Sequence, residues 1–168
     1  MLTAADHLDD QYAVVPALQA AADATTTLRI GALVLCNDYR HPVVTAKELA
    51  TIDVLSGGRL EAGIGAGWMT TDYEQAGIPL DRPGIRIDRM IEALDVLDAL
   101  WADGPATVHG EHYRISDLDG RPKPVQRPRP PVLIGGGGRR VLTVAGQRAD
   151  IVGINLNLVS GTIGADAG

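Results

Sequence analysis

The sequence predicts an α/β fold built on a parallel sheet, either open or closed into a barrel. Short apolar runs alternate with stretches of helical spacing along the chain, which is the order of repeated strand–helix units. Two of the apolar runs end in glycine-rich turns, Gly63-x-Gly65-x-Gly67 and Gly135–Gly138. The chain has 168 residues, of which 45% are hydrophobic, so it is long and apolar enough to build the core of one domain.

The composition argues against several classes of protein. The net charge of −6 and the isoelectric point of about 5.1 disfavour nucleic acid or an anionic membrane as the main partner. A single cysteine, Cys36, cannot form a disulfide framework and fits a reducing cytoplasm. No apolar run reaches the roughly 20 residues of a spanning helix, and residues 1–6 lack the character of a signal peptide. We therefore expect a cytoplasmic protein with no membrane partner.

The first part of the chain predicts a strand, a helix and a second strand. Residues 2–4 form the end of a strand, and the polar pair Asp6-His7 follows where α/β proteins keep their chemistry. Residues 11–24 have helical spacing, with Pro16 near enough to the start to be tolerated. Residues 28–35 form a continuous apolar run, which is typical of a strand buried on both faces.

The middle of the chain predicts three helices around one strand. Pro42 at a first-turn position opens a helix over residues 42–55, which ends at Gly57-Gly58. Residues 59–65 form the next strand. Thr71–Glu74 has capping-box spacing for a short helix, and residues 86–101 keep helical spacing in the longest helix of the chain.

Residues 107–114 predict a small hairpin or an extended excursion that carries two histidines. His109 and His112 suggest a metal pair, but residues three apart in an extended segment point to opposite faces. No other cluster of cysteine and histidine completes a site, so we expect no metal.

The last part of the chain predicts two more strands. Residues 121–131 contain five prolines and form an extended surface connection. A strand at 132–134, a helix at 140–148 and a strand at 149–155 follow, and the small, polar residues 160–168 predict a disordered tail. Four clear strands and the tail of a fifth result, whereas a complete (β/α)8 barrel needs at least about 200 residues.

The glycine-rich turns predict a ligand over the ends of the strands. Glycine lets another group approach the backbone closely, and phosphates bind the free N–H groups at helix N-termini. The alternative is that these glycines only form tight strand-to-helix turns. Neither turn matches the dinucleotide fingerprint G-x-G-x-x-G or the Lys-Ser/Thr ending of a P-loop.

As a set, these motifs resemble the bacterial luciferase-like family of flavin- or deazaflavin-dependent oxidoreductases, which fold as (β/α)8 barrels. The resemblance covers nearly the whole chain in the family's order and rests on Asp6-His7, Arg29–Leu35 with Arg40-His41-Pro42, Asp53-x-Leu55-Ser56-Gly57-Gly58-Arg59, Gly63-x-Gly65-x-Gly67-Trp68, Ile134–Gly138 and Ala149-Asp150.

The resemblance implies a partial (β/α)8 TIM barrel of parallel strands with its first and last strands missing. Residues 1–168 would form a single incomplete domain. In the family the Asp-His pair follows the second strand, so the first strand and helix would precede Met1, and the last two strands with their helices would follow Gly168.

The resemblance also implies catalytic residues. Asp6 and His7 would lie near an isoalloxazine-type ring, with His7 as the acid/base. This assignment agrees with the residue type, because histidine exchanges protons near neutral pH. Some deazaflavin-dependent sugar-phosphate dehydrogenases carry a glutamate where this chain has Trp68, so a sugar phosphate is not the substrate that we expect.

Eight residues match cofactor-binding positions of the family. Leu33-Val34 would form a non-prolyl cis peptide bulge behind the ring, although such a bond ordinarily costs roughly 3–4 kcal/mol. Gly65, Ala66 and Gly67 would flank the ribityl or phosphate part of the cofactor. Gly137, Gly138 and Arg139 would bind phosphate through main-chain N–H groups and charge.

The implied function is hydride transfer between coenzyme F420 and a small organic substrate. A first alternative is an FMN-dependent monooxygenase supplied with reduced flavin by a separate reductase. A second is an inactive truncated remnant, or a module that only associates with other subunits. We also expect a homo-oligomer, because a barrel that is open at both ends leaves unpaired strand edges.

Overall fold

A parallel sheet organises this computed structural model, which describes residues 1–155. The strands lie side by side in the order β1 (Leu2–Ala4), β2 (Ile30–Ala32), β4 (Leu60–Gly65), β7 (Val132–Gly136) and β8 (Ile151–Ile154), with β3 (Leu35–Cys36) pairing with β4. Every neighbouring pair in this sheet is parallel. The strands predicted at residues 2–4, 59–65, 132–134 and 149–155 are therefore confirmed, and β7 continues two residues further than expected.

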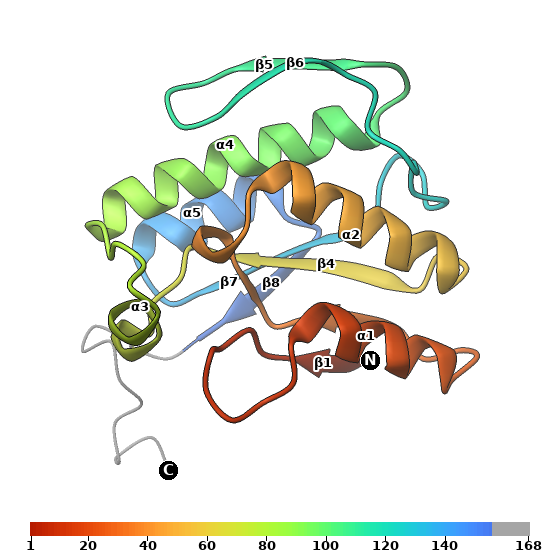
Figure 1. The fold of residues 1–168 in the computed structure, drawn as a ribbon, viewed down its shortest axis with the longest axis horizontal. Helices are drawn as coiled ribbons and strands as arrows, with labels where there is room; N and C mark the ends of the chain where they lie inside the picture. The colour runs from red at the N-terminus through yellow and green to blue at the C-terminus, as the bar shows by residue number, and fades with distance from the viewer. Residues whose placement is uncertain (156–168) are drawn as a thin grey trace.

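Four helices line up along the sheet in chain order (Figure 1). They are α1 (Val14–Asp23), α2 (Pro42–Leu55), α4 (Pro83–Trp101) and α5 (Arg139–Arg148). Each helix contacts the next one, α1 with α2, α2 with α4 and α4 with α5. None of the helices within residues 1–155 is both long and apolar enough to cross a membrane.

Smaller elements occupy the connections. A 3-10 turn, η1 (Asn37–Tyr39), and the short helix α3 (Thr70–Ala76) lie after β3 and β4. The antiparallel hairpin of β5 (Ala106–His109) and β6 (Arg114–Leu118) confirms the prediction for residues 107–114 and lies over α4, away from the sheet (Figure 1).

The core lies between the sheet and the helices and is aliphatic, as a chain without phenylalanine requires. All six residues of β4 are buried, which explains why its sequence shows no alternation of polar and apolar residues. Trp101 is the largest fully buried side chain, and its indole Nε1 donates to the carbonyl of Ala46 at 3.0 Å. This hydrogen bond joins the end of α4 to α2.

The proline-rich connection is anchored by a buried carboxylate. Asp53 on α2 is completely buried. Its carboxylate accepts hydrogen bonds from the backbone N–H groups of Val125 and Gln126 at 2.8 and 3.0 Å and from the Gln126 amide at 2.7 Å. Asp53 therefore acts as a structural link between α2 and the segment that leads into β7.

Several helix boundaries differ from the prediction. Helix α1 begins at Val14, three residues later than expected, and α4 begins at Pro83, three residues earlier, with its proline in the first turn. The capping box predicted for Thr71–Glu74 is wrong, because Met69 is the N-cap and no side chain caps the helix. The expected tail at 160–168 lies outside the described residues.

The continuous strand predicted over residues 28–35 is also wrong. It is divided into β2 and β3 by Leu33 and Val34, and the peptide bond between these two residues is cis. The cis bond itself was expected at this position. Strand β2 pairs with the start of β4, whereas β3 pairs with its end.

Candidate functional site

The C-terminal ends of the strands surround a cleft of about 1000 Å³. The loops after successive parallel strands meet at this end, which is where α/β folds carry their ligand sites. The cleft lies at the upper end of the usual range for small-molecule pockets, roughly 300–1,000 Å³. Its walls also include the first turn of α4.

The cleft brings together nine of the ten predicted site residues: Asp6, His7, Leu33, Val34, Gly65, Ala66, Gly67, Gly137 and Gly138. The tenth, Arg139, is an exposed residue at the start of α5 and is not part of the wall. Trp68 is part of the wall as well. Residues from four separate segments of the sequence thus meet in one space.

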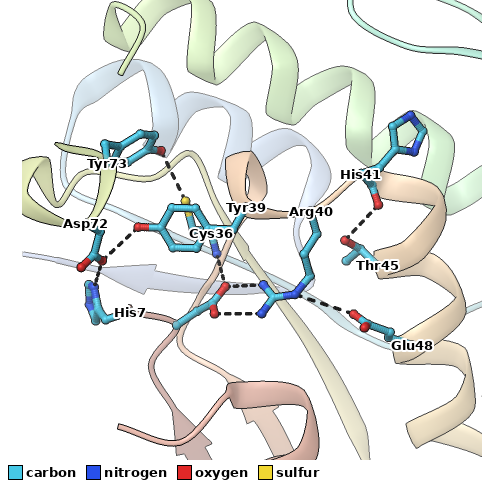
Figure 2. Close-up of polar contacts among 10 residues, drawn as sticks. His7, Cys36, Tyr39, Arg40, His41, Thr45, Glu48, Asp72 and Tyr73 are labelled. Carbon is cyan, nitrogen blue, oxygen red and sulfur yellow. Dashed lines mark hydrogen bonds and ion pairs between the residues drawn. The ribbon is translucent and has the colours of Figure 1, made fainter. Parts of the chain in front are cut away.

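His7 reaches the cleft from the loop after β1. Its Nδ1 lies 2.8 Å from Oδ2 of Asp72 on α3, and its side chain is 18% exposed. The hydroxyl of Tyr39 donates to the same oxygen at 2.9 Å (Figure 2). Trp68 packs edge-on against the imidazole, with the ring centroids 5.6 Å apart. His7 is therefore a fixed side chain rather than a mobile loop histidine.

Asp6 is buried, and its carboxylate is engaged on both oxygens. Arg40 donates through Nη1 to Oδ2 at 2.6 Å and through Nη2 to Oδ1 at 3.1 Å. The backbone N–H of Cys36 donates to Oδ2 at 3.0 Å. Because these donors hold the carboxylate against β3, the geometry favours a positioning role for Asp6 over the catalytic role expected from the resemblance.

A second polar chain lies behind the cleft wall. The hydroxyl of Tyr73 donates to Asp38 at 2.9 Å and lies 3.3 Å from Sγ of Cys36. Since the single proton of Tyr73 is given to Asp38, the thiol of Cys36 is the donor in the second contact. Burial raises the pKa of Cys36 to about 11, so the thiol stays protonated and is not a nucleophile at neutral pH.

The first glycine-rich turn has a packing role that the sequence did not show. A Cβ on Gly63 would overlap the carbonyl of Ala32, and one on Gly65 would overlap the side chain of Val34. Gly63 and Gly65 therefore lie inside β4 and let the neighbouring strand and the cis bulge approach. Gly67 has a φ of +76° and is packed against Tyr73, so it too must be glycine.

The second glycine-rich turn is open toward the cleft. Gly137 and Gly138 are exposed, and Gly138 is the N-cap of α5. A Cβ added at Gly138 would meet no atom within 4 Å, so packing does not explain this glycine. The free N–H groups at the start of a ten-residue helix favour an anion there.

A buried arginine near this turn was missed by the sequence prediction. Arg86 lines the cleft, is 8% exposed, and lies over the ring of Tyr73 at 5.8 Å. It donates to the carbonyl of Gly67, but its Nε has no partner, and no carboxylate pairs with it among residues 1–155. A buried cation without a counter-ion is costly, so an anionic ligand in the cleft would compensate it.

The sequence carried a signal for Arg86 that was not used. Counting back from Met90 by one helical turn places residue 86 on the buried face of α4, where a charged side chain needs a reason. The starts of α4 and α5 also lie together, because Arg140 donates to the carbonyl of Gly84 at 3.1 Å and pairs with Asp88. Arg82, Arg86 and Gly138 all line the cleft beside these two helix starts.

Metal binding finds no support in residues 1–155. No group of three or more histidine, cysteine or carboxylate side chains there could hold a metal ion. His109 is exposed at the end of β5.

Comparison with known proteins identifies the family. The model of the luciferase-like monooxygenase family matches residues 1–162. The chain belongs to this family. It is 33% identical over 159 residues to an FMNH2-dependent dimethylsulfone monooxygenase from Pseudomonas putida, a match that covers 95% of this chain and 44% of that protein.

Solved structures of this family share the fold. A coenzyme F420-dependent tetrahydromethanopterin reductase from Methanopyrus kandleri superposes with a TM-score of 0.82 at 26% identity, covering 91% of this chain and 47% of that one. An F420-dependent secondary alcohol dehydrogenase, solved with an F420–acetone adduct, superposes with a TM-score of 0.80 at 24% identity, covering 89% and 47%. The sheet is thus a parallel, five-stranded half-barrel, and the predicted partial TIM barrel is confirmed.

The chain spans under half the length of these relatives. By their names, these relatives use FMN or F420. The chain therefore belongs to a family of flavin- and F420-dependent oxidoreductases.

Proposed function

We propose that this chain binds coenzyme F420 in the cleft and contributes to hydride transfer between that cofactor and a small organic substrate. The observation that carries the proposal is the convergence of His7, the cis bulge and the open glycine turn on one cleft of about 1000 Å³. The likeness to an F420-dependent reductase, with a TM-score of 0.82, supports it.

The residues present fit such a cofactor at both ends of the cleft. At one end, Leu33 is 49% exposed and is part of the cleft wall, where an apolar side chain can back a flat ring. At the other end, the open turn at Gly137 and Gly138 and the unpaired Arg86 suit a phosphate or carboxylate group. Arg139 would add charge only from outside the wall.

The cofactor, when bound, supplies the hydride chemistry, and the chain supplies position and proton transfer. His7 holds or releases a proton at the cleft surface. Asp6 keeps the loop that carries His7 in place through Arg40. Ala66 and Gly67 also line the cleft and would contact the cofactor there.

The second candidate is an FMN-dependent monooxygenase that works with a separate flavin reductase. It is favoured by the 33% identity to an FMNH2-dependent monooxygenase. The same residues would hold FMN, because FMN also has a flat ring and a phosphate group. We also propose a homo-oligomer in the cytoplasm, supported by the one-sided pairing of β1 within the described residues and by the free, buried Cys36.

A parallel titration distinguishes the candidates. The purified protein is titrated with oxidised F420 and with FMN, and quenching of the ligand's own fluorescence is followed. Tighter binding of F420 supports the first proposal, and tighter binding of FMN supports the second. Binding of neither, by a protein that unfolds cooperatively, would refute both and favour a module for subunit association.

A further inference from the structure

One carboxylate oxygen holds both His7 and Tyr39. Asp72 is 3% exposed, and its Oδ2 lies 2.8 Å from His7 Nδ1 and 2.9 Å from the Tyr39 hydroxyl. His7 comes from the loop after β1, Tyr39 from η1 and Asp72 from α3, so the contact joins three segments that are far apart in the sequence (Figure 2). Asp6 and Arg40, the charged groups beside it, pair with each other.

The proton inventory of this contact decides which nitrogen of His7 carries hydrogen. Tyr39 has a single proton and donates it to Oδ2. The short approach of Nδ1 to the same oxygen requires one further proton between them. Because Oδ2 already accepts the proton of Tyr39, we assign it the acceptor role in the second contact as well, with the proton on Nδ1 of the imidazole.

The other ring nitrogen is consequently the one that meets a ligand. Nε2 of His7 has no hydrogen-bond partner among residues 1–155, and the side chain forms part of the cleft wall. The edge-on contact with Trp68 keeps the ring from turning over without displacing the indole. The neutral ring would then present a lone pair, not an N–H group, to the cleft.

We infer that Asp72 is a positioning residue that holds His7 as its Nδ1–H tautomer, so that the ligand group in contact with Nε2 is a hydroxyl or N–H donor. The inference deepens the proposed function, since it rests on His7 as the proton-transfer group of the cleft. It assigns the substrate class by its chemistry: a molecule whose reacting group carries an acidic enough O–H or N–H to give a proton to Nε2. A ligand that presents only a carbonyl oxygen finds no donor at neutral His7.

The tautomer can be measured without any cofactor. Two-bond 1H–15N correlation spectra of the ligand-free, 15N-labelled protein at about pH 8.5, roughly two units above the usual histidine pKa, separate protonated from bare ring nitrogens. The His7→Gln protein identifies the His7 signals among those of the four histidines. We expect a protonated Nδ1 and a bare Nε2. In the unaltered protein, a protonated Nε2 with a bare Nδ1 would by itself overturn the inference.

Two variants test the part played by Asp72. In Asp72→Ala, His7 should lose the uniform Nδ1–H pattern and populate both tautomers. The control is Glu74→Ala, which removes an exposed carboxylate from the same helix and should leave the spectrum unchanged. An unchanged pattern in Asp72→Ala would also overturn the inference. Because the spectra need no F420 or FMN, their outcome is independent of whether either cofactor binds.

Discussion

Replacing Asp6 with alanine should destabilise the fold, whereas replacing its neighbour His7 with glutamine should not. Asp6 is 6% exposed and accepts three hydrogen bonds, two from Arg40 and one from the backbone of Cys36. His7 makes one such contact and is partly exposed. The two adjacent residues are thus held by different contacts, although the sequence analysis placed both in the catalytic group.

The magnitude follows from what the substitution leaves behind. Breaking a buried ion pair ordinarily costs roughly 3–5 kcal/mol, because the remaining charge is uncompensated. The cost here lies at the low end of this range, because the Arg40 side chain is 22% exposed and its Nε still lies 3.8 Å from Oε2 of Glu48. The unpaired N–H of Cys36 adds roughly 1 kcal/mol. We therefore expect a loss of about 3–4 kcal/mol in the free energy of unfolding, which is a large part of the roughly 5–15 kcal/mol of a typical domain.

Urea denaturation followed by circular dichroism measures this loss. At about 2–4 °C per kcal/mol for a chain of this size, the melting temperature of Asp6→Ala should fall by about 10 °C. The control Asp10→Asn changes an exposed carboxylate in the same loop and should shift the free energy of unfolding by less than about 0.5 kcal/mol. A loss of under about 1 kcal/mol in Asp6→Ala would show that the ion pair does not hold the loop.

Three further outcomes are expected. Gly138→Val should weaken cofactor binding by at least about tenfold, or 1.4 kcal/mol, with no loss of stability, because its Cβ points into open space. The matched variant Gly146→Val, also in open space but within α5, should bind as the parent does. Equal affinities of Gly138→Val and the parent would contradict the phosphate assignment. The free energy of unfolding should fall between about pH 9 and pH 11, because the pKa of the Cys36 thiol is raised to about 11 in the fold from 9.0 ordinarily, so unfolding releases a proton in this range. At roughly 1.36 kcal/mol per pH unit, this group accounts for about 3 kcal/mol of the fall. Urea denaturation at pH 8 and 10.5 should show a smaller fall in Cys36→Ser. Sedimentation should show dimers or larger species, because β1 pairs on one side only within the described residues, and a monomer at micromolar concentration would count against self-association.

The fold was accessible from the sequence because its signals are local. The buried run at β4, the proline opening α2 and the glycines after it each depend on a few neighbouring residues. The division of residues 28–35 into two strands was not accessible from the apolar pattern, since Leu33 and Val34 are as apolar as the strand residues around them. Only the resemblance to a family pointed to the bulge.

The candidate site was accessible only in part because its contacts are not local. Asp72 lies 65 residues from His7 in the sequence, and its local pattern suggested a helix cap, which the structure does not contain. Arg86 was treated as the first residue of a helix, although its place on the buried face set it apart. Gly63 was interpreted as part of a turn that either contacts a ligand or only changes the direction of the chain, but the atom that requires this glycine is a carbonyl oxygen of the neighbouring strand.

A buried arginine gives this acidic protein a partner for an anionic ligand. The chain carries a net charge of −6, and two carboxylates that line the cleft are paired with arginines, Asp6 with Arg40 and Asp81 with Arg89. Arg86 also lines the cleft and has no carboxylate partner among residues 1–155, so an anionic ligand can pair with it there. Binding of an anionic ligand should accordingly weaken with added salt, more steeply in the parent than in Arg86→Met.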